Sequence, residues 1–243
     1  MDAERIARRL TACGIPCDEA LAGRLAVYGD MLLDWNTRMD LTAVKEEDEV
    51  VDRHFADSLS ILACPGLIPA EGRLIDVGTG AGFPGMVLAL ACPGLRVTLL
   101  DALQKRLRFL EAVAEKSGAV NVVLAHARAE DGARQPELRE AFDVAAARAV
   151  APLPVLAEYL LPYVRVGGIA LCWKGPALSG ELETGRRAAH VLGGRAEEAI
   201  PVRFPGRDWE HSLLPIRKLQ PTPKAYPRKA GTPAKSPLGG PRP

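Results

Sequence analysis

The spacing of apolar residues predicts helices in the first part of the chain. Apolar positions recur every three or four residues over 2–12 and 18–39, as in amphipathic helices. The stripe of the second helix consists of Leu21, Leu25, Tyr28, Leu32 and Trp35. We expect this stripe to pack on a neighbouring domain face and not to bind a cofactor.

A third amphipathic helix is predicted within residues 39–62, where Thr42 can cap a turn. Its apolar face consists of Val50, Val51, His54, Phe55, Leu59 and Leu62. His54 lies near Asp57, and a histidine beside a carboxylate can act as a general base. We favour a packing role for His54, because a histidine at the edge of an apolar face is more often hydrogen-bonded within the fold.

From residue 73 onward the pattern alternates between strand and helix. Strands are predicted over 73–77, 96–100, 121–125, 142–147 and 168–173, and helices over 84–91, 103–117, 152–162 and 178–192. This alternation is typical of a parallel sheet covered on both faces. The last segments, 196–203 and 210–218, have no helix between them. We expect them to close the sheet as an antiparallel hairpin, as in methyltransferases and unlike most dehydrogenases.

Composition narrows the class of protein without identifying it. The chain has 243 residues, of which 48% are hydrophobic and 25% charged, as in ordinary globular proteins. It has neither an apolar run of membrane-spanning length nor a secretory signal at its N-terminus, so we expect a cytoplasmic protein. Its five cysteines lack C-x-x-C spacing, so we expect neither a disulfide framework nor a metal site.

Charge is unevenly distributed along the chain. The net charge is +1, but residues 220–243 carry five cations and no acid, which leaves −4 for residues 1–219. This segment also has seven prolines, so we expect it to be extended or mobile until a partner orders it. A predicted RNA-binding cluster comprises Tyr226, Arg228 and Lys229. The alternative is a solvated linker end.

A glycine-rich loop, LIDVGTGAGFPG at 74–85, joins a predicted strand to a predicted helix. Its glycines permit a tight turn and close approach to a ligand, and the helix start offers unpaired N–H groups. We expect a nucleotide-like cofactor here. Gly80, Gly82 and Gly85 also satisfy the G-x-G-x-x-G fingerprint of NAD-binding proteins, with Asp101 at a suitable distance for a ribose. Alone, that match is weak.

Acidic residues at three successive strand ends favour S-adenosylmethionine over NAD. Asp76 lies two residues before Gly78, giving the D-x-G-x-G-x-G pattern of methyltransferase cofactor loops. Asp101 ends the second strand, where it can hold both ribose hydroxyls, and Glu130 follows the third strand near the expected adenine edge. Alternatively, these acids cap helices. We predict an α/β, Rossmann-like class I S-adenosylmethionine-dependent methyltransferase fold with a mostly parallel seven-stranded sheet.

The next two strands end in cations that we predict to take part in catalysis. Arg148 should face the ligand crevice outside the carboxyl ends of the strands, where it can bind a carboxylate, a phosphate or a base. Lys174 offers a charge for phosphate, whereas the neighbouring Trp173 is a flat surface or a core residue. The fourth strand lacks the N-P-P-Y or D-P-P-Y motif of methylases that act on exocyclic amines.

These motifs resemble, nearly end to end, the bacterial 16S rRNA (guanine-N7) methyltransferase family called RsmG or GidB. The similar blocks are MDLTAV, EVVDRHFADSLSIL, IDVGTGAGFPG, LLDALQKRLRFL, ARAED, ARAVAPLPVL, GGIALCWKGP and PTPKAYPRKAGTPAKSPL. The resemblance implies cofactor contacts from Gly78, Phe83, Asp101, Ala129, Glu130 and Arg148. It also implies the substrate, N7 of guanine 527 (standard rRNA numbering) in 16S rRNA of the small ribosomal subunit.

The resemblance agrees with a division into an N-terminal helical cap (1–70), a methyltransferase domain (71–219) and a basic tail (220–243). Guanine N7 carries a free lone pair, so its methylation needs no metal, covalent nucleophile or strong base, and positioning should supply most of the rate. We expect Arg148 and Lys174 to hold RNA phosphate or the guanine near the methyl group.

Three other functions stay open at this point. They are an NAD-linked dehydrogenase, a methyltransferase acting on a small molecule or protein, and a non-catalytic RNA-binding or assembly protein. The basic tail with its tyrosine favours RNA over a small molecule. We expect a monomer that acts on the small subunit or its assembly intermediate, and not on DNA.

Overall fold

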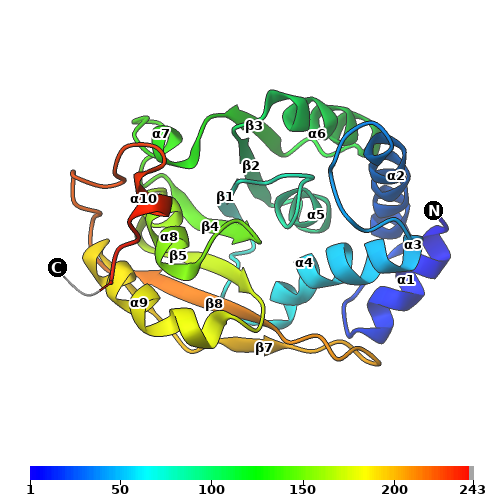
Figure 1. Cartoon of the computed structure of the whole chain (residues 1–243). Coiled ribbons are helices and arrows are strands. Elements are labelled where there is room, and N and C mark those ends of the chain that lie inside the picture. The colour runs from blue at the N-terminus through cyan, green and yellow to red at the C-terminus, as the bar shows by residue number, and fades with distance from the viewer. Residues whose placement is uncertain (241–243) are drawn as a thin grey trace.

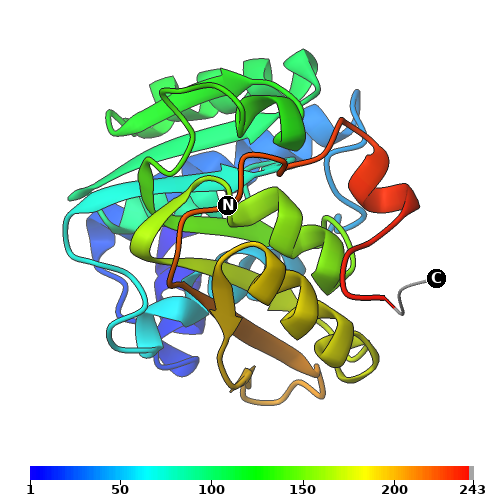
Figure 2. The ribbon, with the colours of Figure 1, turned by 90° about the vertical axis from the view of Figure 1, so that its left-hand side faces the viewer.

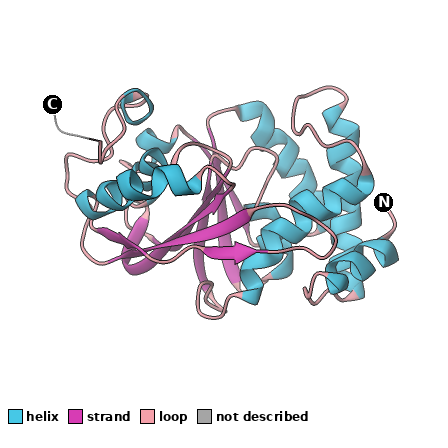
Figure 3. Cartoon of the chain, turned by 60° about the horizontal axis from the view of Figure 1, so that its bottom comes forward, coloured by secondary structure: helices cyan, strands magenta, loops and turns pink. Residues whose placement is uncertain are grey.

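The computed structural model describes residues 1–240, and its centre is one sheet with helices on both sides (Figures 1 and 3). The strands are β1 (Gly72–Val77), β2 (Leu95–Asp101), β3 (Val122–His126), β4 (Phe142–Arg148), β5 (Val164–Lys174), β6 (Gly194–Ala196), β7 (Ile200–Val202) and β8 (His211–Lys218). Their order is β3-β2-β1-β4-β5-β8-β6, and β7 also pairs with β8. The first five strands are parallel, which confirms the alternating pattern.

The antiparallel end of the sheet is confirmed as well, with one difference. β8 is antiparallel to β5 on one edge and to both β6 and β7 on the other. One strand is predicted over 196–203, but only Ile200–Val202 (β7) forms a strand within it, and β6 lies mostly before it. These two short strands share the last position in the sheet. The eight strands therefore fill seven positions.

The N-terminal helices are shorter and less regular than the apolar spacing predicts. They are α1 (Ala3–Ala12), α2 (Glu19–Asn36), α3 (Glu47–Val50), the π-helical turn η1 (Val51–Ala56), α4 (Asp57–Leu59) and the 3-10 turn η2 (Ser60–Ala63). The third predicted helix thus begins at Glu47 and contains a wide π turn around His54. Such turns are often found at functional sites.

Two hydrophobic clusters lie on opposite faces of the sheet. The remaining helices are α5 (Gly85–Ala91), α6 (Gln104–Ser117), α7 (Ala129–Gly132), α8 (Leu153–Leu160), α9 (Leu178–Val191) and α10 (Thr232–Lys235). One cluster joins α5 and α6 to the N-terminal helices, and the other packs α8 and α9 on the sheet. Figure 1 shows α1 to α4 stacked against the layer of α5 and α6.

The apolar stripe of α2 packs against the glycine-rich loop, as expected for a face that meets a neighbouring layer. Tyr28 is fully buried, its ring stacks on Phe83 with centroids 5.4 Å apart, and its hydroxyl donates a hydrogen bond to the carbonyl of Ala81. The helical segment therefore contributes directly to holding the loop.

The C-terminal segment contradicts the prediction of a mobile tail over its described part, residues 220–240. Arg139 donates hydrogen bonds to the carbonyls of Thr222 and Tyr226, each 2.9 Å long. Arg228 pairs with the fully buried Glu158 at 2.6 Å. A proline-rich chain lacks N–H donors for a strand ladder, but its carbonyls still accept bonds from arginines. Figure 2 shows the segment crossing the molecule before it forms α10.

Candidate functional site

The glycine-rich loop turns sharply where β1 meets the end of β2. The N–H groups of Gly78 and Thr79 both donate to the carbonyl of Leu100, at 2.8 and 3.0 Å. Gly78 and Gly80 adopt left-handed φ angles of 74° and 60°, which glycine tolerates best. A Cβ added to Gly80 would meet only the Gly78 carbonyl, at 3.9 Å. A side chain there would therefore occupy open space that the bare backbone leaves to a ligand.

Asp76 holds this loop from below and does not line a cavity. Its buried Oδ2 accepts hydrogen bonds from the Thr79 hydroxyl at 2.7 Å and from the Gly85 N–H at 2.9 Å. Burial raises the pKa of this carboxyl to about 6. The sequence predicted a direct cofactor contact, whereas the structure places Asp76 as a positioning residue for the loop and the first turn of α5.

Asp101 connects the end of β2 to the loop. Its Oδ2 accepts from the Gly80 N–H at 2.9 Å and its Oδ1 from the Leu103 N–H at 2.8 Å, with Arg106 3.5 Å from Oδ2. A carboxylate oxygen can accept two bonds, so Oδ1, which accepts one, still has capacity for a hydroxyl of a ribose. The ribose contact of Asp101 stays a prediction.

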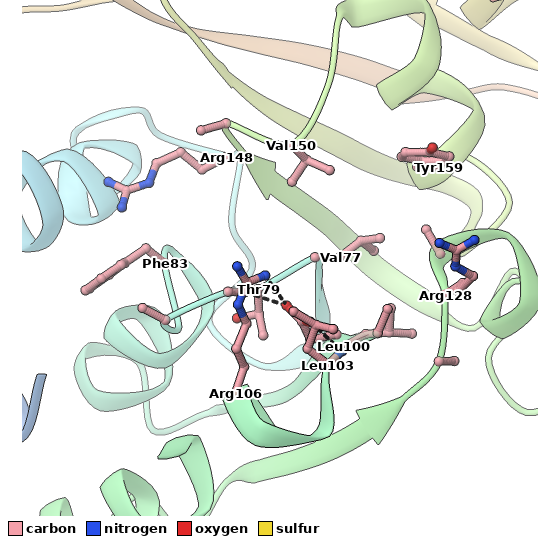
Figure 4. A pocket seen from close by; sticks show the side chains of 18 of the residues that line it. Val77, Thr79, Phe83, Leu100, Leu103, Arg106, Arg128, Arg148, Val150 and Tyr159 are labelled. Atoms are coloured by element: carbon pink, nitrogen blue, oxygen red, sulfur yellow. Dashed lines mark hydrogen bonds and ion pairs between the residues drawn. The ribbon is translucent and has the colours of Figure 1, made fainter. Parts of the chain in front are cut away.

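These groups border a cavity of about 700 Å³ at the carboxyl ends of the parallel strands (Figure 4). Seven of the eight predicted cofactor residues line it: Gly78, Gly80, Phe83, Asp101, Ala129, Glu130 and Arg148. Phe83 and Arg148 lie toward one end, and Tyr159 and Arg128 lie toward the other. A site at this edge is the rule for open α/β sheets.

The cavity wall includes residues that sequence reasoning assigned elsewhere or missed. Gly231 and Ala234 of the C-terminal segment line it, and the Gly231 N–H donates to Glu130 Oε1 at 2.7 Å. Thr42 and His54 of the helical segment line it from another side. The one local signal among these residues is Asp57 near His54, because only the tertiary fold brings the others to the loop.

Arg148 is fixed by groups from the N-terminal helices. One of its terminal nitrogens donates to the Arg53 carbonyl at 2.8 Å and to Asp57 Oδ2 at 2.9 Å. The other donates to His54 Nδ1 at 3.0 Å, and the guanidinium lies over the Phe83 ring, 5.0 Å from its centroid. The predicted site residue is present at the crevice, in a single well-defined orientation.

His54 is a packed, hydrogen-bonded residue, as the sequence predicted, and it also borders the cavity. Its ring stacks on Phe83 with centroids 4.4 Å apart, and its Nε2 lies 2.8 Å from the Thr42 hydroxyl oxygen. Burial, together with the positive charge of Arg148, lowers the pKa of His54 to about 3. It is therefore neutral at physiological pH.

Asp57 holds two side chains at once, those of Arg148 and His211. Its Oδ1 pairs with His211 Nδ1 at 3.0 Å and its Oδ2 with Arg148, while its carbonyl accepts from Trp173 Nε1 at 2.9 Å. Burial alone raises the pKa of the Asp57 carboxyl, but the bonds from His211 and Arg148 outweigh that effect, so its pKa stays below the ordinary value.

A second cavity of about 400 Å³ adjoins the first and shares four wall residues with it, Thr42, His54, Arg148 and Ala149. Its other wall residues are Ala43, Val44, Arg53, Asp57, Ala151, Trp173, Lys174, Gly175 and His211. The two cavities therefore meet at the junction formed by the four shared residues.

Lys174 lines the second cavity with its charge already paired. Its ammonium lies 2.6 Å from Glu181 and 3.2 Å from the carbonyl of Ala151. Trp173 is only 5% exposed, so it is largely a core residue. In the predicted RNA-binding cluster, Arg228 is paired with Glu158, Tyr226 is partly buried and Lys229 is exposed. The structure thus brings Lys174 to Arg148 but keeps the tail cluster apart.

Within residues 1–240 no helix is both long and apolar enough to cross a membrane. The same residues hold no group of three or more histidine, cysteine or acidic side chains placed to bind a metal ion.

The fold and the glycine-loop cavity are those of a class I S-adenosylmethionine-dependent methyltransferase. The chain belongs to the GidB family, rRNA small subunit methyltransferase G, whose family profile matches residues 22–203. It is 48% identical to the Ribosomal RNA small subunit methyltransferase G of Alkaliphilus oremlandii, over 92% of this chain and 93% of that one. Its relative of the same name in Lactobacillus johnsonii is 41% identical, over 98% and 100%.

Solved structures share the fold at low sequence identity. A variant of the 16S rRNA (adenine(1408)-N(1))-methyltransferase of Catenulisporales acidiphilia, solved with its cosubstrate SAM, is 20% identical with a TM-score of 0.51. That likeness covers 63% of this chain and 87% of the other. A predicted O-methyltransferase of Agrobacterium tumefaciens, also 20% identical with a TM-score of 0.51, covers 66% and 79%.

The cavity residues fit S-adenosylmethionine, the cofactor of this fold. The open backbone at Gly80 leaves room for a ligand that a Cβ would displace, and Asp101 retains acceptors where a ribose is expected. The class of cofactor and the rRNA methyltransferase family are thereby established. The atom that receives the methyl group is a separate question.

Proposed function

We propose that this protein methylates N7 of one guanine of 16S rRNA, guanine 527 in standard numbering. The observation that carries the proposal is the junction between the two cavities. A cofactor in the larger cavity and a base in the smaller one would meet at Thr42, His54 and Arg148, which line both. The relatives' name supports rRNA of the small subunit as the substrate.

The residues of the first cavity have separate roles in this proposal. Gly78 and Gly80 admit the cofactor to the loop, Asp101 accepts from the ribose hydroxyls, and Ala129 and Glu130 border the adenine. Bound S-adenosylmethionine supplies an electrophilic methyl group on a sulfonium. Asp76 keeps the loop in place through Thr79 and Gly85.

The chemistry suits a site without a free general base. Guanine N7 has an unshared electron pair and carries no proton to remove, so the enzyme has to orient the base and exclude water. His54 and Asp57 are both engaged with Arg148, which leaves them a positioning role. Arg148 presents donors at the junction, where they can hold a phosphate or another acceptor of the RNA, while the N7 lone pair stays free to attack the methyl group.

RNA contacts outside the cavities are proposed for the exposed face. Lys229 of the tail is free to meet phosphate, whereas Lys174 would have to exchange Glu181 for phosphate and Arg228 would have to leave Glu158. Tyr226 keeps only part of its ring exposed for stacking. We expect a cytoplasmic monomer that acts on the small subunit or its assembly intermediate, with the division at residues 70 and 219.

The test is incubation of the protein and methyl-labelled S-adenosylmethionine with unmethylated small ribosomal subunits, followed by borohydride and aniline treatment. That treatment cuts RNA at 7-methylguanosine. A single enzyme-dependent cut in 16S rRNA supports the proposal. Cofactor binding without RNA label would contradict it and would direct attention to small molecules or ribosomal proteins as substrates.

A further inference from the structure

The hydrogen bonds around His54 determine which atom of its ring carries the proton. Arg148 is a donor only, so the His54 Nδ1 atom that it contacts at 3.0 Å must accept. The single proton of the neutral ring is therefore on Nε2. Nε2–H consequently donates to the Thr42 hydroxyl oxygen, 2.8 Å away. The lowered pKa of His54 agrees, because a second proton on Nδ1 would face the guanidinium.

The same accounting leaves the hydroxyl proton of Thr42 free. Its oxygen accepts from His54 Nε2–H and from the Val44 N–H at 3.1 Å, which uses both lone pairs. Throughout residues 1–240, no acceptor is paired with the Thr42 hydroxyl proton. A hydroxyl held in this way acts as a donor only, and Thr42 lines both cavities.

We propose that the 400 Å³ cavity holds the flipped-out target guanine and that the Thr42 hydroxyl donates to its O6. This inference rests on the proposed function. On guanine, O6 and N7 are neighbouring acceptors on one edge, so a base that presents N7 to the cofactor places O6 at the same junction. Adenine would present its amino group there, so two hydrogen-bond donors, the amino group and the Thr42 hydroxyl, would face each other. His54 is the positioning residue that makes Thr42 a donor.

The size and lining of the cavity suit a base removed from its stack. Pockets for small ligands start at about 300 Å³, and they combine apolar walls with a few oriented polar groups. Here Ala43, Val44, Ala149 and Ala151 provide the apolar surface, while Thr42 and Arg148 provide donors at the end nearest the cofactor. Enzymes that modify a base commonly take it into a pocket of this kind.

The experiment uses small subunits reconstituted with 16S rRNA that carries guanine, inosine or 2-aminopurine at the target position. Inosine retains N7 and O6, whereas 2-aminopurine retains N7 and lacks O6. For the wild-type protein we expect similar kcat/KM with guanine and inosine, and a value about tenfold or more lower with 2-aminopurine, because a donor would be left unpaired.

The decisive comparison is Thr42→Val, which removes the hydroxyl at nearly constant volume. We expect it to lower kcat/KM for guanine about tenfold and to bring the guanine to 2-aminopurine ratio close to one. Thr42→Ser should restore most of the ratio. Thr37→Val is the matched control, because the exposed Thr37 hydroxyl bonds only the Asp34 carbonyl and Thr37 lines neither cavity.

The outcomes separate this inference from the proposed function. If wild-type protein places no methyl group on N7 of the target guanine, the proposed function fails. If it does, but Thr42→Val keeps the wild-type ratio, the O6 contact is refuted, since misfolding alone would lower all three rates together. A tenfold loss of S-adenosylmethionine affinity with an unchanged ratio would also refute it and assign the hydroxyl to the cofactor.

Discussion

The two walls of the cofactor cavity differ in how the chain builds them. The loop wall comes from residues 77–83 and Asp101, at the ends of two neighbouring strands. Backbone N–H groups and the carboxylates of Asp76 and Asp101 hold it. The facing wall combines residues 42–57, Arg148 and residues 231–234, which are far apart in the sequence. Ion pairs and side-chain hydrogen bonds hold this second wall together. The first wall is fixed by local turns, whereas the second depends on docking of both chain ends.

Within the facing wall, the contact between the tail and α8 should be the one whose loss has the largest effect. Arg228→Met removes the partner of Glu158, which is fully buried, so the charge is left uncompensated. We expect a loss of about 3–5 kcal/mol in the free energy of unfolding, measured with denaturant. Lys229→Met, a similar change at an exposed neighbour, should stay within about 0.5 kcal/mol.

The same variant tests whether the tail is a cavity wall. Release of the tail removes Gly231 and Ala234 from the wall and frees Glu130. S-adenosylmethionine affinity should therefore fall together with stability in Arg228→Met. A destabilised variant that binds the cofactor with wild-type affinity would show that the tail serves RNA alone, as its basic composition suggested.

On the loop wall, Gly80→Ala tests whether the bound cofactor contacts the backbone at Gly80, apart from the backbone strain that the substitution adds. Both Gly80 and Gly118 adopt left-handed φ angles, 60° and 72°, so alanine costs about 1 kcal/mol at either position. Only at Gly80 does the added methyl group enter the cavity. Calorimetry should show about 10- to 100-fold weaker S-adenosylmethionine binding for Gly80→Ala.

Gly118→Ala is the control, because it ends α6 with nothing within 4 Å of an added Cβ. It should lose similar stability and bind the cofactor normally. Equal binding by the two variants would mean that the ligand does not approach the backbone at Gly80.

The pH dependence of stability should show whether His54 stays neutral in the folded protein. Its folded pKa, about 3, lies below its ordinary value of 6.5, so only the unfolded chain takes up the proton between these values. Stability is therefore complete above pH 6.5 and falls as pH is lowered toward 3. For His54 alone the loss at pH 5 is roughly 2 kcal/mol.

Comparison with His54→Gln isolates this effect. Asp57 and Asp76 titrate in both proteins, and Asp76, whose pKa is raised, acts in the opposite direction because its folded form keeps a proton up to about pH 6. The variant should lose less stability than the wild type between pH 7 and 5 in urea titrations. Parallel curves would show that His54 is protonated in the folded state.

The sequence predicted most of the loop wall because its signals are local. Glycines before a helix and an acid at the end of a strand constrain neighbouring backbone, and the structure has Gly78, Gly80 and Asp101 at the expected edge. Asp76 shows the limit of such a pattern: its spacing indicated the loop correctly, but burial directs its carboxylate into the loop and not into the cavity.

The facing wall could not be predicted from local signals in the same way. Thr42 lies in the loop before α3 and His54 in η1, and the role of both depends on Arg148, about a hundred residues downstream. The tail misled for a similar reason. Its composition is that of a mobile segment, and only the positions of Arg139 and Glu158 explain why it is fixed.

The smallest expected effect concerns RNA binding by the tail. It separates tail residues that pack on the rest of the protein from those that bind RNA. Lys229 is exposed, whereas Arg228 is paired with Glu158, so Lys229 is the neighbour able to reach phosphate. In filter-binding titrations with unmethylated 16S rRNA, Lys229→Met should weaken binding a few-fold. The slope of log K against log salt should fall by about one, because one counterion fewer is released.

Lys116→Met provides the control for this last comparison. Lys116 is exposed in the last turn of α6, and this end of the helix lies at the amino ends of the parallel strands, on the edge of the sheet away from the cavities. Its loss changes the net charge equally but removes no proposed contact. Equal salt slopes for the two variants would mean that the tail attracts RNA through overall charge and that its ordered residues serve the cavity wall.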